Sequence, residues 1–92
     1  MANLSERLIY APGGELMMKL DGLSGALGLE PTAARLFDEC ARDELRDRGA
    51  EAEGLLEADW VRGALAQLEL NGLAERGAYA LLTATINASP QN

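Results

Sequence analysis

The sequence predicts a mainly α-helical fold, a small single-domain bundle of three to five helices, with a C-terminal β-hairpin as an open alternative. Three observations favour it. Apolar residues recur at spacings of three and four in several segments. A chain of 92 residues has room for one hydrophobic core. Its 48% hydrophobic and 25% charged content is typical of a folded chain. We therefore treat residues 1–92 as one domain.

The N-terminal part of the chain holds the weakest predicted helix. Residues 4–10 can form either a helical turn or an extended segment, and the Pro-Gly-Gly run at 12–14 ends it. A helix is then expected from Glu15 onward, and its core-facing stripe consists of Leu16, Leu20, Leu23 and Leu27. Gly22 and Gly25 would lie inside this helix and cost about 1 kcal/mol each relative to alanine. Such a helix would depend on packing for its stability.

The next predicted helix starts at Glu30 and Pro31 and ends at Arg48, before Gly49. Its apolar face is expected to consist of Ala33, Leu36, Phe37, Cys40, Ala41 and Leu45. Cys40 is therefore predicted to be a small core residue. The carboxylates of this helix alternate with arginines, as on a solvated face whose charges neutralise one another.

A third helix is predicted from Asp59, a plausible N-cap, to Leu70, and Asn71 with Gly72 should end it in a left-handed cap. Residues 73–87 fit two structures equally well. One is a hairpin that turns at Arg76 and Gly77 and places Tyr79, Leu81, Thr83 and Thr85 on one side. The other is a final helix with Tyr79, Leu82 and Ile86 on its inner face.

Two segments have a general likeness to DNA-binding motifs. Residues 23–32 resemble a helix-turn-helix, and residues 59–79 resemble the third helix and wing of a winged-helix domain. The likeness implies a transcriptional regulator as the alternative function. Arg62 and Arg76 are the only basic residues in the second segment, which favours protein contacts over DNA.

The residue types that carry most catalysis are scarce in this chain. It has no histidine and one cysteine, so a nucleophile would lack its usual base, and no segment has the ligand spacing of a metal site. We expect no enzyme activity, no cofactor and no metal. No stretch approaches 18 apolar residues, and the single cysteine cannot form an internal disulfide. The expected location is the cytoplasm, away from membranes.

The net charge of −7 indicates the kind of partner. Phosphate backbones are repelled and basic protein surfaces are attracted, so direct nucleic-acid binding is not expected. A homodimer is also compatible with the sequence, because a glycine-weakened helix would gain burial from it.

We therefore predict a non-enzymatic acidic adaptor or inhibitor that binds a basic protein surface, in one version by mimicking nucleic acid. Trp60, beside Glu57 and Asp59, is either a partner anchor or a core residue. Met18, which falls off the leucine stripe, and Tyr79 complete the predicted contact surface.

Overall fold

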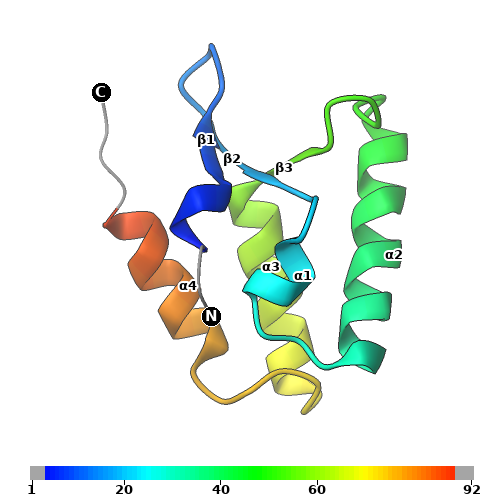
Figure 1. Cartoon of the computed structure of the whole chain (residues 1–92), viewed down its shortest axis with the longest axis vertical. Helices are drawn as coiled ribbons and strands as arrows, with labels where there is room; N and C mark the ends of the chain where they lie inside the picture. Colours follow the sequence, from blue (N-terminus) through cyan, green and yellow to red (C-terminus); the bar gives the residue numbers. More distant parts are fainter. Residues whose placement is uncertain (1–3, 89–92) are drawn as a thin grey trace.

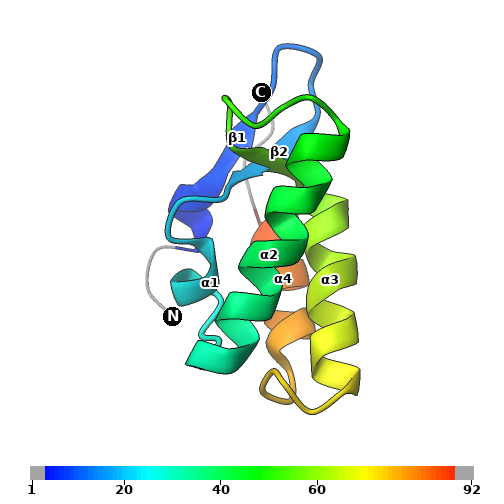
Figure 2. The same ribbon diagram turned by 90° about the vertical axis from the view of Figure 1, so that its right-hand side faces the viewer.

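The computed structural model describes residues 4–88, which form a mixed α/β arrangement of helices and a three-stranded antiparallel sheet. The strands are β1 (Leu8–Tyr10), β2 (Leu16–Lys19) and β3 (Leu55–Glu57). The helices are the 3₁₀ turn η1 (Ser5–Arg7), α1 (Leu23–Ala26), α2 (Pro31–Asp47), α3 (Ala58–Leu70) and α4 (Ala78–Asn87). The three long helices stand side by side with α3 in the middle, and the sheet crosses their upper end (Figure 1). Figure 2 shows the β1–β2 hairpin and α1 on one side of this helical layer.

The sheet is built around β2, its central strand. Met18 lies opposite Leu8 of β1 on one side and opposite Leu56 of β3 on the other. The loop between β1 and β2 contains the Pro-Gly-Gly run, and the Ala11 N–H donates to the Glu15 carbonyl at 2.8 Å. Both readings of residues 4–10 are therefore realised, since a short turn precedes the strand.

The helix expected from Glu15 onward is wrong for its first half. Residues 16–19 form β2, and only Leu23–Ala26 are helical. Pairing with two strands satisfies the backbone of β2 on both edges, which a local leucine spacing cannot reveal. Gly22, placed inside the expected helix, instead precedes α1 with φ of +73° and no helical conformation. The leucines keep their core role, since Leu23 and Leu27 are buried.

The long helices α2 and α3 confirm the predicted helices except at the start of α3, where the N-cap is Glu57 and the predicted cap, Asp59, lies inside the first turn. α2 begins at Pro31 and ends one residue before Arg48, its C-cap. α3 ends at Leu70 with Asn71 as its C-cap, and Gly72 follows with φ of +75°. The Leu73 N–H donates to the Leu68 carbonyl at 2.8 Å, a bond that closes the helix end.

Residues 78–87 form the helix α4, and no hairpin is present there. The fold class is therefore mixed α/β rather than mainly α, and the hairpin lies near the N-terminus. Leu82 is buried while Leu81 is 45% exposed, which is the pattern of the helical alternative. Glu69 of α3 supports the start of α4, because its carboxylate accepts the Gly77 N–H at 3.1 Å and the Tyr79 N–H at 2.9 Å.

The core lies where the sheet, α1 and the inner faces of the long helices meet. Its fully buried large side chains are Phe37, Met18, Leu23, Leu56, Leu65, Leu82 and Val61. The radius of gyration is 12.4 Å, close to the roughly 12 Å of a compact chain of this length. Among the helices between residues 4 and 88, none is both long and apolar enough to span a bilayer.

Candidate functional site

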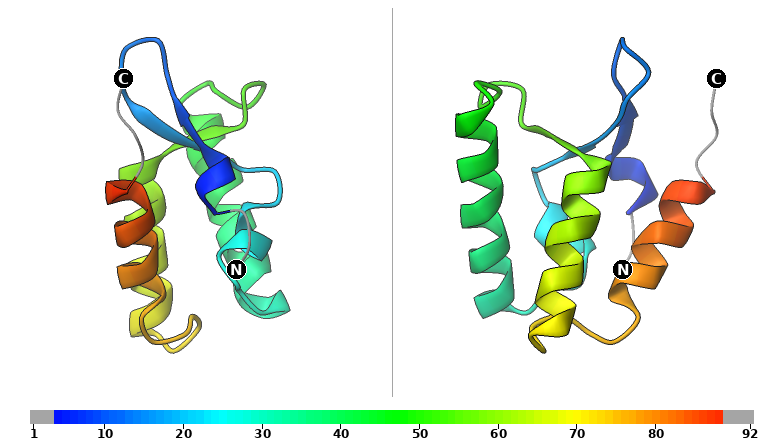
Figure 3. Two further views of the ribbon diagram at one scale, coloured as in Figure 1. Left: turned by 60° about the vertical axis from the view of Figure 1, so that its left-hand side comes forward. Right: turned by 180° about the vertical axis from the view of Figure 1, so that it is seen from behind.

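An apolar groove of about 530 Å³ lies between α2 and α3. These two helices stand next to each other in the right-hand view of Figure 3. The lining residues, which define the α2–α3 groove, are Leu36, Phe37 and Cys40 of α2, Asp59, Trp60, Gly63, Ala64, Gln67 and Leu68 of α3, and Asn71 at the end of α3.

Helical spacing builds the two walls. Leu36 and Cys40 are one turn apart on α2, while Trp60, Ala64 and Leu68 follow one another turn by turn along α3. The Phe37 and Trp60 rings join the walls, with centroids 5.9 Å apart and planes tilted by 51°. This is a favourable aromatic geometry, and it holds the half-buried Trp60 in place beside the buried Phe37.

The groove is open to solvent on its α2 side. Leu36 is 42% exposed and Cys40 is exposed, so the prediction that Cys40 belongs to the core is wrong. The buried stripe of α2 instead consists of Ala33, Phe37, Ala41 and Leu45. Leu36 and Cys40 lie at the margin of that stripe, on the side that α3 leaves uncovered. The exposure of Leu36 and Cys40 therefore depends on how the neighbouring elements pack against α2.

Asp59 is the one charged side chain among the described lining residues of the groove. Its side chain is 90% exposed, and it lies 3.4 Å from an Arg62 nitrogen. On α2, the face that lines the groove becomes acidic beyond Cys40, because Asp43 and Asp47 follow Cys40 at i+3 and i+7. The groove thus has an acidic end, where α2 finishes and α3 begins (Figure 1).

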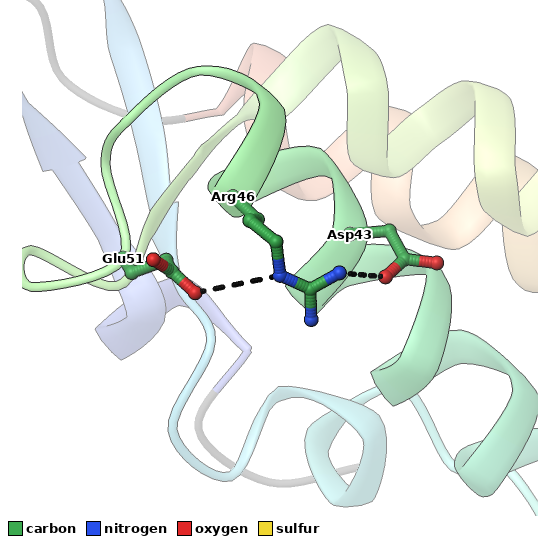
Figure 4. Close-up of polar contacts among 3 residues, drawn as sticks. All are labelled: Asp43, Arg46 and Glu51. Carbon is green, nitrogen blue, oxygen red and sulfur yellow. Dashed lines mark hydrogen bonds and ion pairs between the residues drawn. The ribbon is translucent and has the colours of Figure 1, made fainter.

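The arginines of α2 lie away from this end or are paired. Arg35, Arg42 and Arg46 each directly precede a residue on the groove side of α2, namely Leu36, Asp43 and Asp47. One residue turns a side chain about 100° around the helix, so the three arginines start from a different face. Arg46 contacts Asp43 at 2.8 Å and Glu51 at 3.7 Å (Figure 4). Arg48 contacts Glu57 at 3.1 Å and Glu44 at 4.0 Å. Arg46 therefore offsets the charge of Asp43, and the acidic character of this end rests on the 90% exposed Asp59 and on Asp47.

The structure distributes the predicted contact residues over four places: the groove, the end of β3, the strand β2 and the helix α4. Trp60 and Asp59 both line the groove. Glu57, the last residue of β3, lies just before α3 and pairs with Arg48. Met18 is 0% exposed in the central strand, so the expected exposure of its side chain is wrong and it is left out of the site.

Tyr79 lies on α4, across α3 from the groove. Its hydroxyl oxygen accepts a hydrogen bond from Arg62 at 3.2 Å, and the Arg62 guanidinium carbon is 5.7 Å from the ring centroid. The hydrogen bond from Arg62 lowers the pKa of Tyr79, and the same bond raises the pKa of Arg62. These contacts tie α4 to α3 and give Tyr79 a structural role.

Sequence reasoning missed the contribution of Leu36, which it placed on the apolar face of its helix, and it did not name Ala64 or Leu68 as contact residues. The sequence did offer one signal, because the apolar stripes of α2 and α3 are wider than the surface that one neighbouring helix or strand can bury. No cluster of three or more His, Cys, Asp or Glu side chains between residues 4 and 88 could hold a metal ion. Comparisons with protein-family models, curated proteins and solved structures found no match to this chain.

Proposed function

We propose that this chain is a non-enzymatic protein-interaction module, an adaptor or an inhibitor, that binds a protein with a basic surface through the α2–α3 groove. The observation that carries the proposal is a solvent-open apolar groove that contains Trp60 and has acid at one end. Apolar surface of this kind is costly to leave in water, and on small proteins it often marks a contact site.

Trp60 is well suited to anchor a partner. Tryptophan is enriched among the few interface residues that carry most binding energy, and the Phe37 ring already restricts its motion. Binding would then immobilise little that is not already ordered, which keeps the entropic cost low.

The charge distribution favours a basic partner. Fifteen acidic residues against eight basic ones attract positive surfaces at long range and raise the rate of encounter. A partner that normally holds nucleic acid in a positive groove would be inhibited by such a surface. We place this module in the cytoplasm, because the exposed Cys40 thiol is unpaired and suits a reducing compartment.

The test compares capture of proteins from the native host by three immobilised forms: wild type, Leu36→Glu and Leu70→Glu. Leu36 lines the groove, whereas Leu70 is 79% exposed at the end of α3 outside it. We expect the specific partner to bind Leu36→Glu at least about tenfold more weakly and Leu70→Glu normally.

Trp60→Ala provides a second variant, which should lose the partner while far-ultraviolet circular dichroism shows that its helices are retained. Equal capture of one basic protein by wild type and both groove variants would overturn the proposal.

A further inference from the structure

We infer that the occupant of the α2–α3 groove is an amphipathic α-helix of the partner, with lysine or arginine residues at the end that lies beside Asp59 and Asp47. This inference rests on the proposed function and specifies what the groove recognises.

The length of the groove suits a helix. Its lining runs along α3 from Asp59 to Asn71, and twelve steps of 1.5 Å correspond to about 18 Å. A helix of about 12 residues has the same length. Two helices already form the walls, and a third helix laid between them would complete a three-helix contact of ordinary geometry.

The wall chemistry suits the apolar face of such a helix. Trp60, Ala64 and Leu68 lie about one helical turn apart along α3. Side chains at i, i+4 and i+7 of an approaching helix are also about one turn apart, so the two rows can pack against each other. Gly63 and Ala64 are small, and a Cβ built on Gly63 would meet no atom within 4 Å. Space is therefore present above the middle of the groove, where a partner helix would approach closely.

The charges set the polarity of the occupant. Asp59 and the acidic continuation of the α2 stripe lie at one end, while Gln67 and Asn71 at the other end are uncharged. A helix with its basic residues at the Asp59 end would gain charge-assisted contacts there. A second copy of this chain, with net charge −7, would meet like charge instead.

The probe is a synthetic helix-forming peptide of about 14 residues with leucines at i, i+4, i+7 and i+11 and lysines in one terminal turn. Its binding is followed through Trp60, the single tryptophan of the chain, and through the rate of Cys40 alkylation. We expect a saturable change in tryptophan emission and at least about tenfold slower alkylation on binding, since both residues line the groove.

Two control peptides test shape and charge. One has the same composition with the leucines moved off a common face, and the other has glutamates in place of the lysines. Both should bind at least about tenfold more weakly.

Matched variants locate the binding. Gly63→Arg fills the space in the groove and should abolish binding without unfolding α3, because arginine is a better helix former than glycine. Leu70→Arg, outside the groove, should bind the peptide normally. Asp59→Asn combined with Asp47→Asn should weaken binding and reduce its salt dependence, whereas Glu75→Gln, in the loop at the other end of α3, should not.

The inference is overturned if the two leucine arrangements bind equally or if Gly63→Arg binds as tightly as wild type. It is also overturned if light scattering shows a dimer that protects Cys40 from alkylation without peptide, or if a small apolar dye saturates the groove while the peptide does not bind. Loss of the captured protein in Leu36→Glu together with no peptide binding would leave the proposed function intact and reject the helical occupant. Capture that ignores Leu36 would reject the function itself.

Discussion

At the scale of single residues, Gly22 controls how the chain passes from the sheet into α1. Its φ of +73° lies in the left-handed region, and a Cβ added there would lie 2.7 Å from a terminal nitrogen of Arg7. Arginine can move aside, but the backbone conformation cannot be changed without shifting α1. The requirement for glycine is therefore mainly conformational.

Gly22→Ala is expected to lower the free energy of unfolding by about 1 to 2 kcal/mol, because a side chain disfavours the left-handed conformation. Gly25→Ala is the matched control. A Cβ at Gly25 meets no atom within 4 Å, and this glycine lies inside α1, so alanine should be neutral or stabilise by up to about 1 kcal/mol. Urea unfolding of the two variants measures the difference. Similar effects of both substitutions would contradict this account of Gly22.

At the scale of elements, α4 depends on α3 for the start of its helix. No side chain of its own N-terminal residues caps it, and the first free N–H groups are bound by Glu69 from α3. The hydrogen bonds from the Tyr79 and Gly77 N–H groups lower the pKa of Glu69. The charged form of Glu69 is therefore the one that stabilises the fold.

The stabilisation from Glu69 is fully present above the ordinary glutamate pKa of about 4.3 and is lost as pH falls through the lower pKa of the folded state. Glu69→Ala should lower the thermal unfolding midpoint at neutral pH, and its difference from wild type should shrink below about pH 4. Circular dichroism melts across this range provide the measurement, with Glu75→Ala as a control that should change little. A difference that stays constant with pH would argue against the capping role.

At the scale of the whole molecule, charge separates the two functional hypotheses. The structure contains a helical corner between α1 and α2, but α4 occupies the place where the winged-helix likeness would require a hairpin. The first turns of α2 offer Thr32 and Arg35 and few other groups suited to bases or phosphates.

We expect no retardation of genomic DNA fragments by the purified protein, even at low salt, because its net charge of −7 repels phosphate. A basic DNA-binding domain of similar size serves as the positive control. Strong binding with a steep salt dependence would favour the transcriptional regulator over the interaction module.

The parts of the molecule that local chemistry controls were predictable. The ends of α2 and α3 follow from Pro31 and from Gly72, since helix starts and stops are decided within a few residues. The proximity of Trp60 to Asp59 was also predictable, because both lie in the first turn of one helix. The acid excess, and the class of partner proposed from it, require no coordinates at all.

Contacts between segments far apart in the sequence determined the rest of the fold and the groove. β2 is a strand because Leu8–Tyr10 and Leu55–Glu57 pair with its two edges, and neither partner is visible in the local leucine pattern. The same holds for the groove. Leu36 and Cys40 look like core residues along the helix, and they are exposed because α3 approaches α2 through the Phe37–Trp60 pair and leaves the neighbouring face uncovered. The periodicity of one helix locates its apolar face, but which part of that face is buried depends on the elements that pack against it.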